Sequence, residues 1–370
     1  MTSGMIPRSP PGADWRHWTV AITGMNSRPD SPGPGMAVAR CLREAPEFQG
    51  HIIGIGYEAL DAGLHHQGLC DAGYLLPYPS AGGGALAERL SEICAKERID
   101  AIVPCLDAEL PTFIEAAPQL TAAAGVRCLL PNCQQLRNRA KDRLPALAAA
   151  LGIAVPETRV LSDPGFFDRA ETEGWDFPLV VKGVFYDAAV VHRPAEAKAA
   201  FAELAARWGY PVLVQRFLLG YEVNLTAVGD GRGGLLGSVM MRKHAVTDKG
   251  KAWAGITILD DALLGLAEAL VRELAWPGPL EVEVLCGPDG SRNLIEINPR
   301  FPAWVYLSHG VGRNLPVQLL RLLAGEAPAA LPPAEPGMMF LRHAEELILP
   351  LARLEAMLTA GEWPRLDRVA

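Results

Sequence analysis

The sequence of 370 residues has no apolar run near the roughly 20 residues that a membrane-spanning helix needs. Its seven cysteines are scattered and form no Cys-x-x-Cys pair, so neither a disulfide framework nor a zinc site is indicated. Basic residues are outnumbered by acidic ones: the net charge is −8, which argues against nucleic acid as a partner. These absences set aside membrane, zinc and nucleic-acid-binding classes. Unpaired cysteines indicate the reducing cytoplasm.

The first residues also lack the apolar segment of a signal peptide, and we expect residues 1–18 to be a flexible leader. The rest has an ordinary globular composition, with 49% hydrophobic and 21% charged residues. At roughly 150 residues per domain, this length predicts two or three domains.

Residues 19–135 alternate between strand and helix patterns. Strands followed by helices imply parallel pairing through right-handed crossovers. This part therefore predicts a small doubly wound α/β domain. We expect strands at 19–24, 51–56, 100–104 and 127–130, and helices at 36–44, 85–98 and 110–124.

From residue 136 the pattern changes to α+β with a mainly antiparallel sheet. A first part, residues 136–215, contains expected helices at 137–151 and 194–208 and strands at 178–184 and 211–217. In a second part, residues 216–325, closely spaced strand signals surround one helix at 262–274. Residues 326–370 are predicted to be a linker and a C-terminal extension. The strand signals of the second part are at 222–229, 234–242, 253–259, 280–285 and 293–298.

Two of these strands flank the sequence GPDGS, which is a strong hairpin signal. A turn centred between Asp289 and Gly290 would place Glu283 opposite Glu296. Because side chains alternate along a strand, one face of the hairpin would be polar and the other apolar. The polar face would carry Glu281, Glu283, Glu296 and Asn298, and the core face Val282, Val284, Ile295 and Ile297.

Like charges directly opposite each other destabilise a strand pair, and the polar face has no interleaved lysine. Three carboxylates and an amide on one face therefore require a cation. Hard oxygen ligands of this kind suit Mg²⁺, which commonly takes one or two carboxylates together with substrate phosphates. Arg300 follows on the same face and could meet a phosphate or a carboxylate.

The string LIEINPRF contains Glu296, and Glu283 of GPLEVEV lies 13 residues before it. Together these two strings resemble the Mg-ATP site of the ATP-grasp superfamily. The resemblance implies that Glu283, Glu296 and Asn298 hold Mg²⁺, or Mn²⁺ in its place, between the phosphates of ATP. It also implies a catalytic role for Arg300 on the phosphate or substrate side.

Further positions agree with this family in order along the chain. Lys141 and Lys182 match its two phosphate-binding lysines, and Lys182 would also be catalytic. A hinge whose backbone holds adenine would consist of Gln215, Arg216, Phe217 and Leu218. Glu222 lies where the family carries its ribose-binding acid.

The resemblance is closest to carbamoyl-phosphate-synthetase-like and PylC-like carboxylate–amine ligases. It implies a Rossmann-like pre-ATP-grasp domain followed by an ATP-grasp fold, with a lid subdomain and an antiparallel C-terminal subdomain. The implied activity is ATP-dependent ligation through an acyl phosphate, forming ADP. The carboxylate would be an amino acid, a peptide or a similar small molecule, and the nucleophile an amine or a related group. A homodimer is compatible with the resemblance.

Two departures from the family pattern, and two further cations, bear on the substrates. The lid segment Gly183–Val190 has one glycine and two aromatics, which indicates different closure or a substrate stacked on Phe185 or Tyr186. Glu281 replaces an arginine found in some amino-acid ligases, which fits a cationic acceptor. Arg242 and Lys243 are candidate cations for phosphate or substrate carboxylate.

The acceptor side stays open at this stage. Candidates are Trp304, Tyr306, His309, Asp107 and Glu109, and His309 is as consistent with a structural role as with a general base. Two alternatives keep the fold: a nucleotide-binding relative without ligase activity, and a carboxyphosphate-forming enzyme. A dinucleotide-dependent oxidoreductase is disfavoured because the glycines after the first strand do not form GxGxxG.

Overall fold

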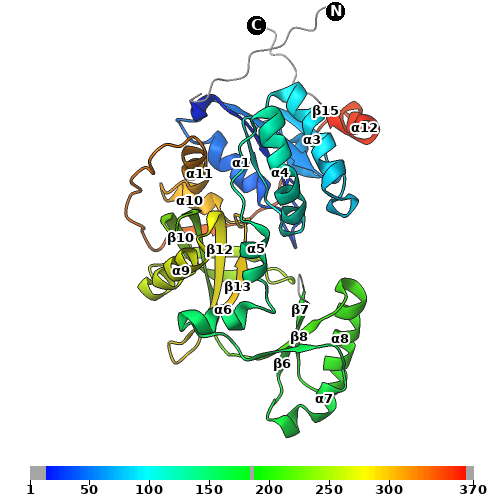
Figure 1. Cartoon of the computed structure of the whole chain (residues 1–370), viewed down its shortest axis with the longest axis vertical. Coiled ribbons are helices and arrows are strands. Elements are labelled where there is room, and N and C mark those ends of the chain that lie inside the picture. The colour runs from blue at the N-terminus through cyan, green and yellow to red at the C-terminus, as the bar shows by residue number, and fades with distance from the viewer. Residues whose placement is uncertain (1–13, 184–186, 364–370) are drawn as a thin grey trace, which may run out of the picture.

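The computed structural model describes residues 14–183 and 187–363. Three β-sheets, A, B and C, follow one another along the long axis of the molecule (Figure 1). Sheet A lies at the end with α1, α3 and α4, sheet B lies in the middle, and sheet C lies at the opposite end. Within the described ranges, no helix is both long and apolar enough to cross a membrane.

Sheet A confirms the predicted parallel α/β domain. Its strands β1 to β4 are parallel and stand in the order β3-β2-β1-β4. Helices α3 and α4 pack on one face, and α1 packs on the other. The strands are β1 (Thr19–Ile22), β2 (His51–Gly56), β3 (Ala72–Leu75) and β4 (Ala101–Val103). The helices are α1 (Gly35–Arg43), α2 (Ala62–His65), α3 (Gly83–Glu97) and α4 (Leu110–Ala124).

One strand prediction in this domain was wrong, and one strand was missed. The apolar segment 127–130 makes a single bridge, from Arg127 to Ala101, instead of a strand. The fourth strand of the sheet is β3, whose short sequence AGYL carries a weak strand signal because it contains glycine.

Residues 14–18 correct the expectation of a flexible leader up to residue 18. They contain a short 3₁₀ turn, Trp15–His17, and the side chains of Trp15 and Trp18 are only 1% and 2% exposed. Arg127 lies 4.6 Å from the centre of the Trp18 ring. Two large aromatic side chains bury enough apolar area to hold this segment on the domain.

Sheet B is antiparallel, as predicted, in the order β13-β12-β9-β10-β11-β14. Helix α9 (Asp261–Leu274) packs on one face, while α10 (Tyr306–Gly310) and α11 (Leu315–Leu323) lie on the side of sheet A. Its strands are β9 (Tyr221–Asp230), β10 (Leu235–Val246), β11 (Ala252–Thr257), β12 (Pro277–Cys286), β13 (Arg292–Asn298) and β14 (Met339–Leu341).

Sheet C has the order β5-β8-β6-β7 and its own hydrophobic core beneath α7 and α8. The predicted lid segment begins at the last residue of β6 and ends within β7, and the Gly183 N–H donates to the Asp187 carbonyl at 3.1 Å. Phe185 and Tyr186 lie outside the described residues, and so does their predicted contact with substrate. The elements are β5 (Thr158–Leu161), α7 (Phe166–Arg169), β6 (Leu179–Gly183), β7 (Ala188–Val191), α8 (Pro194–Trp208) and β8 (Val212–Arg216).

The single helix predicted at 137–151 is two helices, α5 (Cys133–Asn138) and α6 (Leu144–Leu151). The break places Lys141 in a turn next to sheet B. It coincides with Pro145 near the start of α6, because proline is tolerated in the first turn of a helix but not further inside.

The C-terminal segment connects sheets B and A. Strand β14 pairs with β11, helix α12 (Leu351–Ala360) follows, and β15 (Glu362–Trp363) pairs antiparallel with β3 at the edge of sheet A. The Trp363 indole N–H donates to the Leu64 carbonyl at 2.9 Å. The extension predicted from residue 326 therefore completes both sheets.

Candidate active site

The acidic hairpin forms in the predicted register. Glu283 pairs with Glu296 and Glu281 pairs with Asn298 across β12 and β13. A β-bulge follows, so that Val284 pairs with Leu294 and Ile295 is the extra residue. Ile295 therefore corrects the predicted core face: Leu294 takes its place in the core under α9, and Ile295 lines a cavity.

That narrow cavity lies between sheet C and the segment formed by α6 and β13. It brings together three residues predicted for nucleotide binding, Lys141, Lys182 and Gln215, from three separate elements. Their neighbours are mostly apolar, and the cavity measures only about 10 Å³ in this structure, so a nucleotide base would enter it only if its two sides moved apart. The other lining residues are Leu144, Pro145, Val155, Thr158, Leu213 and Ile295.

The two lysines of the cavity differ in their surroundings. The Lys141 ammonium lies 3.2 Å from a Glu296 carboxylate oxygen. Lys182 stands on β6 in an apolar strand, and its burial, with Lys141 close by, lowers its pKa from 10.5 to about 8. An anion placed between the two ammonium groups would relieve this cost, because an opposite charge favours the protonated form.

The two candidate cations of β10 point to opposite faces of sheet B, because side chains alternate along a strand. Lys243 lies between Glu222 and Glu283, 3.2 Å from the Glu283 carboxylate. Although burial opposes it, the ammonium of Lys243 holds the pKa of Glu283 well below its usual range. Lys243 is thus a site residue.

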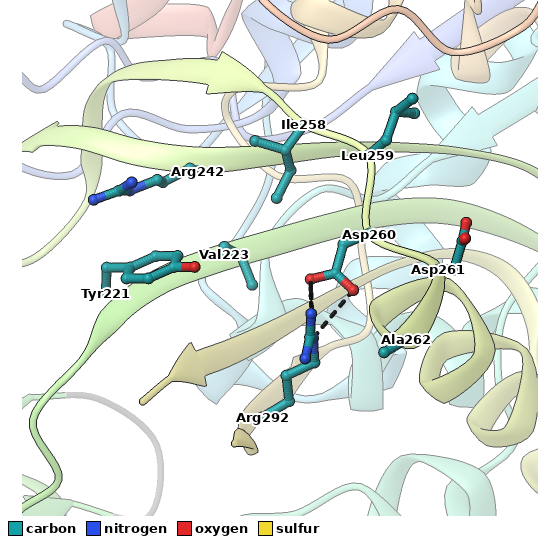
Figure 2. Close-up of a pocket in the computed structure, with 9 residues that line it drawn as sticks. All are labelled: Tyr221, Val223, Arg242, Ile258, Leu259, Asp260, Asp261, Ala262 and Arg292. Carbon is teal, nitrogen blue, oxygen red and sulfur yellow. Dashed lines mark hydrogen bonds and ion pairs between the residues drawn. The ribbon is translucent and has the colours of Figure 1, made fainter. Parts of the chain in front are cut away.

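Arg242 lies outside the candidate site, which corrects its prediction as a cation for phosphate or substrate carboxylate. Its guanidinium lies 4.1 Å from the centre of the Tyr221 ring, in a hollow of about 510 Å³ beside the start of α9. Figure 2 shows this hollow, in which Arg292 pairs with Asp260. Arg242 and Val223 are paired across β10 and β9, and Val223 belongs to the core on the α9 side of the sheet.

The predicted hinge follows β8. Gln215 faces the cavity and donates to the Thr158 hydroxyl at 2.9 Å. Arg216 faces away: its side chain bonds Glu157 at 2.6 Å and lies over Trp175, and its backbone N–H donates to the Glu157 carbonyl. Phe217 and Leu218 lie in the connection to β9, with partly buried side chains.

Arg300 is held by acids from two parts of the chain. Its Nε donates to Asp107 of the sheet A domain at 2.8 Å, and its Nη1 lies 3.5 Å from Glu281. Arg139 lies 4.0 Å from the same Asp107 carboxylate. Although burial opposes it, the guanidinium groups of Arg300 and Arg139 lower the pKa of Asp107. Asp107, a weak candidate in the sequence, thus belongs to the site.

Glu281 is almost completely buried, and four donors surround its carboxylate. One oxygen accepts from Asn224 at 2.9 Å and from the Trp304 indole at 2.7 Å. The other accepts from Asn298 at 3.0 Å and lies 3.5 Å from Arg300. Burial and the neighbouring Glu283 raise the pKa of Glu281. With its oxygens occupied in this way, Glu281 does not have the free acid group that a cationic acceptor would need, which corrects that expectation.

No known sequence family matches the chain, and no curated protein matches it by sequence. Solved structures do match. The biotin carboxylase domain of 2-oxoglutarate carboxylase from Hydrogenobacter thermophilus, crystallised with MgADP and bicarbonate, is 15% identical and has a TM-score of 0.64. That match covers 84% of this chain and 70% of the other.

Two further structures match over a similar share of this chain. L-amino acid ligase from Bacillus licheniformis is 17% identical with a TM-score of 0.62, over 83% of this chain and 74% of its own. N5-carboxyaminoimidazole ribonucleotide synthetase from Thermotoga maritima is 14% identical with a TM-score of 0.58, over 86% and 79%. The chain has the ATP-grasp fold.

In this ATP-grasp fold, the donor set fits a hard cation. Two carboxylates, Glu283 and Glu296, oppose each other beside the amide of Asn298. The nearby Asn224 Oδ1 is buried without a hydrogen-bond partner among the described residues, and an oxygen of this kind calls for a donor or a cation. In the described ranges, no three His, Cys, Asp or Glu side chains converge on one point, so phosphate oxygens would have to complete the coordination.

Asn224 is the site residue that sequence reasoning missed. It lies on β9 opposite Glu283, two residues after Glu222 and therefore on the same face. The two-residue spacing between Glu222 and Asn224 was a signal in the sequence. The pairing of β9 with β12, on the side of β9 opposite to β10, was not.

Other acceptor-side candidates lie elsewhere in the ATP-grasp fold. Tyr306 stacks on His309 and donates to Glu44, which directly follows α1, so that His309 lies at the contact of α10 with the end of α1. Glu109 is fully buried and accepts from the Cys105 and Leu106 backbone N–H groups at 2.9 and 3.0 Å. These residues are structural in this arrangement, while Trp304 reaches Glu281.

The glycine loop after β1 also has a structural explanation. A Cβ at Gly33 would lie 2.1 Å from the Gly24 carbonyl oxygen, and one at Gly35 would lie 2.0 Å from that of Thr23. Both glycines are therefore required by close backbone packing. The glycines after the first strand are thus explained without a dinucleotide site.

Proposed function

We propose that the protein is an ATP-grasp ligase that activates a small carboxylate with Mg-ATP and joins it to an amine, releasing ADP and phosphate. The observation that supports this most strongly is the pairing of Glu283 with Glu296 beside a cavity that contains Lys141 and Lys182. The arrangement combines an acidic face for a metal with cations for phosphate. The activities of similarly folded enzymes are consistent with it.

Each side chain has a distinct part in the proposal. Glu283, Glu296 and Asn298 would hold Mg²⁺, which when bound neutralises charge on the phosphates of the nucleotide. Lys141 and Lys182 would bind phosphate oxygens, and the apolar lining with Ile295 would take the base. Lys243 forms ion pairs with Glu222 and Glu283 and so compensates their negative charge. Arg300 would meet the carboxylate substrate or the transferred phosphoryl group.

The proposed reaction has two steps. A substrate carboxylate oxygen attacks the γ-phosphorus, the bond from that phosphorus to the bridging oxygen of ADP breaks, and an acyl phosphate forms. The amine then attacks the acyl carbon, the C–O bond to phosphate breaks, and the amine nitrogen loses a proton. Such chemistry depends mainly on positioning and on neutralising charge, which this site supplies.

The first test is calorimetric titration of ATP with and without Mg²⁺. We expect wild type to bind ATP in a Mg²⁺-dependent way and Glu296→Ala to lose this dependence. Glu268→Ala, which removes an exposed carboxylate on α9, serves as the matched control and should bind like wild type. Equal Mg²⁺-dependent binding by Glu296→Ala would contradict the site.

A second assay separates the forms of the proposal. ADP release is measured with amino acids, short peptides and bicarbonate as the carboxylate. Release with amino acids or peptides supports the carboxylate–amine ligase, and release with bicarbonate alone identifies a carboxyphosphate-forming enzyme. Binding of Mg-ATP without ADP release under any condition would identify a nucleotide-binding relative. We also expect a homodimer acting in the cytoplasm, which sedimentation and fractionation would test.

A further inference from the structure

The position of Glu281 leads to an inference about how the site is held in shape. Its carboxylate lies two register positions from the Glu283–Glu296 pair, on the same face of the sheet, and is 4% exposed. The proposed reaction uses it neither as a metal ligand nor as a contact to substrate. Four donors nevertheless converge on it, and two of them, Asn298 and Arg300, belong to the proposed machinery.

We propose that Glu281 is a positioning residue that fixes the Asn298 amide so that its oxygen faces the metal. The inference rests on the proposed function. The Asn298 Nδ2 donates to Glu281 at 3.0 Å and to Glu283 at 2.8 Å. Because a carboxylate only accepts, the group that Asn298 turns toward these acids has to be its NH₂. Both amide hydrogens are then used, and the oxygen is the atom left to coordinate a cation.

Glu281 itself is fixed from the opposite side. Asn224 and the Trp304 indole donate to its other oxygen, so the carboxylate cannot rotate without losing charge-assisted hydrogen bonds. Trp304 is 5% and Asn224 1% exposed, so neither finds water as a substitute partner easily. Asn224 and Trp304 therefore fix the orientation of the Glu281 carboxylate, and that carboxylate in turn orients Asn298 and Arg300.

This arrangement makes a specific prediction for Glu281→Gln. A glutamine has one accepting oxygen and one donating NH₂, so whichever way it turns, its NH₂ faces a pair of donors. The substitution keeps the size of the side chain, but the new side chain cannot accept hydrogen bonds from all four donors. Outer groups that orient a metal ligand typically contribute about 10–100-fold to metal affinity, and we expect a loss of that order.

The test measures Mn²⁺ binding in the presence of ADP by electron paramagnetic resonance, which needs no turnover. We expect Glu281→Gln to raise the Kd of Mn²⁺ roughly tenfold or more. Thr226→Val is the matched control: Thr226 pairs with Glu281 in the sheet and donates to the Leu280 carbonyl at 3.0 Å. It removes one buried hydrogen bond there and should leave the Kd within about twofold.

Glu281→Asp separates position from charge. It keeps the carboxylate but is one methylene shorter, so it cannot reach all four donors. We expect a several-fold rise in the Kd of Mn²⁺ although the charge is kept. An unchanged Kd in Glu281→Asp would show that charge alone matters and would overturn the positioning role. This variant also serves if Glu281→Gln does not fold.

A double-mutant cycle with Asn298→Ala completes the test. If Glu281 acts through Asn298, Glu281→Gln should add little to the loss caused by Asn298→Ala alone. Fully additive losses would overturn the proposal. Wild-type protein that binds no Mn²⁺ with ADP would refute the metal site itself, a failure distinct from that of Glu281.

Discussion

Charged side chains at the site are held in pairs of opposite sign that come from different elements. Glu283 lies by Lys243, Glu296 by Lys141, and Arg300 by Asp107. Removing one member of a buried pair leaves its partner uncompensated, at a cost of about 3–5 kcal/mol. Stability should therefore be measured beside binding for Glu296→Ala and for every other variant at the site.

Lys182 gives a prediction for pH. Its pKa of about 8 in the ligand-free protein reflects burial and the nearby Lys141, and polyphosphate would raise it again. Between pH 7.5 and 9.5 the free protein loses this proton, whereas the complex keeps it. Mg-ATP binding should then take up a proton, and affinity should fall by roughly tenfold across this range.

The matched control is Lys182→Arg, since arginine stays protonated throughout this range. Calorimetric titrations in two buffers with different ionisation enthalpies would report both the affinity and the proton uptake. An arginine variant with the same slope against pH as wild type would assign the dependence to another group.

At the scale of elements, the bulge in β13 gives Ile295 and Ile297 different surroundings. Ile297 is fully buried under α9, whereas Ile295 lines the cavity. Ile297→Ala should cost about 2–5 kcal/mol of stability and leave Mg-ATP affinity unchanged in the folded protein.

Ile295→Ala should have the opposite profile, with a smaller loss of stability and several-fold weaker ATP binding. Thermal unfolding and calorimetry on both variants would check this. Equal ATP affinity in Ile295→Ala and wild type would place the base elsewhere.

Element boundaries show where sequence patterns work. The register of β12 and β13 was predicted correctly at Glu281 and Glu283, because GPDGS marks the turn and Glu and Val alternate, but not between the bulge and the turn. The strand β3 and the break before α6 were missed. A four-residue strand carries too few residues for periodicity, and the Ala-rich stretch after Lys141 continues the helical pattern across the break.

At the scale of the whole molecule, the cavity that we propose for the nucleotide takes its walls from two bodies. Lys182, Leu213 and Gln215 come from sheet C, while Lys141, Leu144 and Ile295 come from α6 and its surroundings. Sheet C has a separate hydrophobic core, and Figure 1 shows it at the end of the molecule opposite sheet A. A nucleotide in the cavity would therefore join the two bodies.

We expect Mg-ATP to slow amide hydrogen exchange in β6 and β8 of sheet C as well as in β13. Lysine and backbone contacts from both sides would reduce local opening. Hydrogen-exchange mass spectrometry on wild type and Glu296→Ala would measure this. Protection confined to β13, with none in sheet C, would show that the nucleotide does not bridge the cavity.

The sequence by itself determined the local patterns of this protein. The parallel α/β start, the antiparallel hairpin and the placement of Glu283 opposite Glu296 follow from hydrophobic periodicity and turn chemistry, which act within a few residues. The lysines and the hinge were named from the family resemblance, not from periodicity.

The tertiary structure alone decided which distant groups meet. Asp107 reaches Arg300 across 193 residues, the extension from residue 326 adds strands to two sheets, and Trp15 is buried despite its place in the expected leader. Four donors meet on Glu281 because β9, β12 and β13 pair side by side and Trp304 packs against them. Such contacts depend on strand order and packing, which no local pattern encodes.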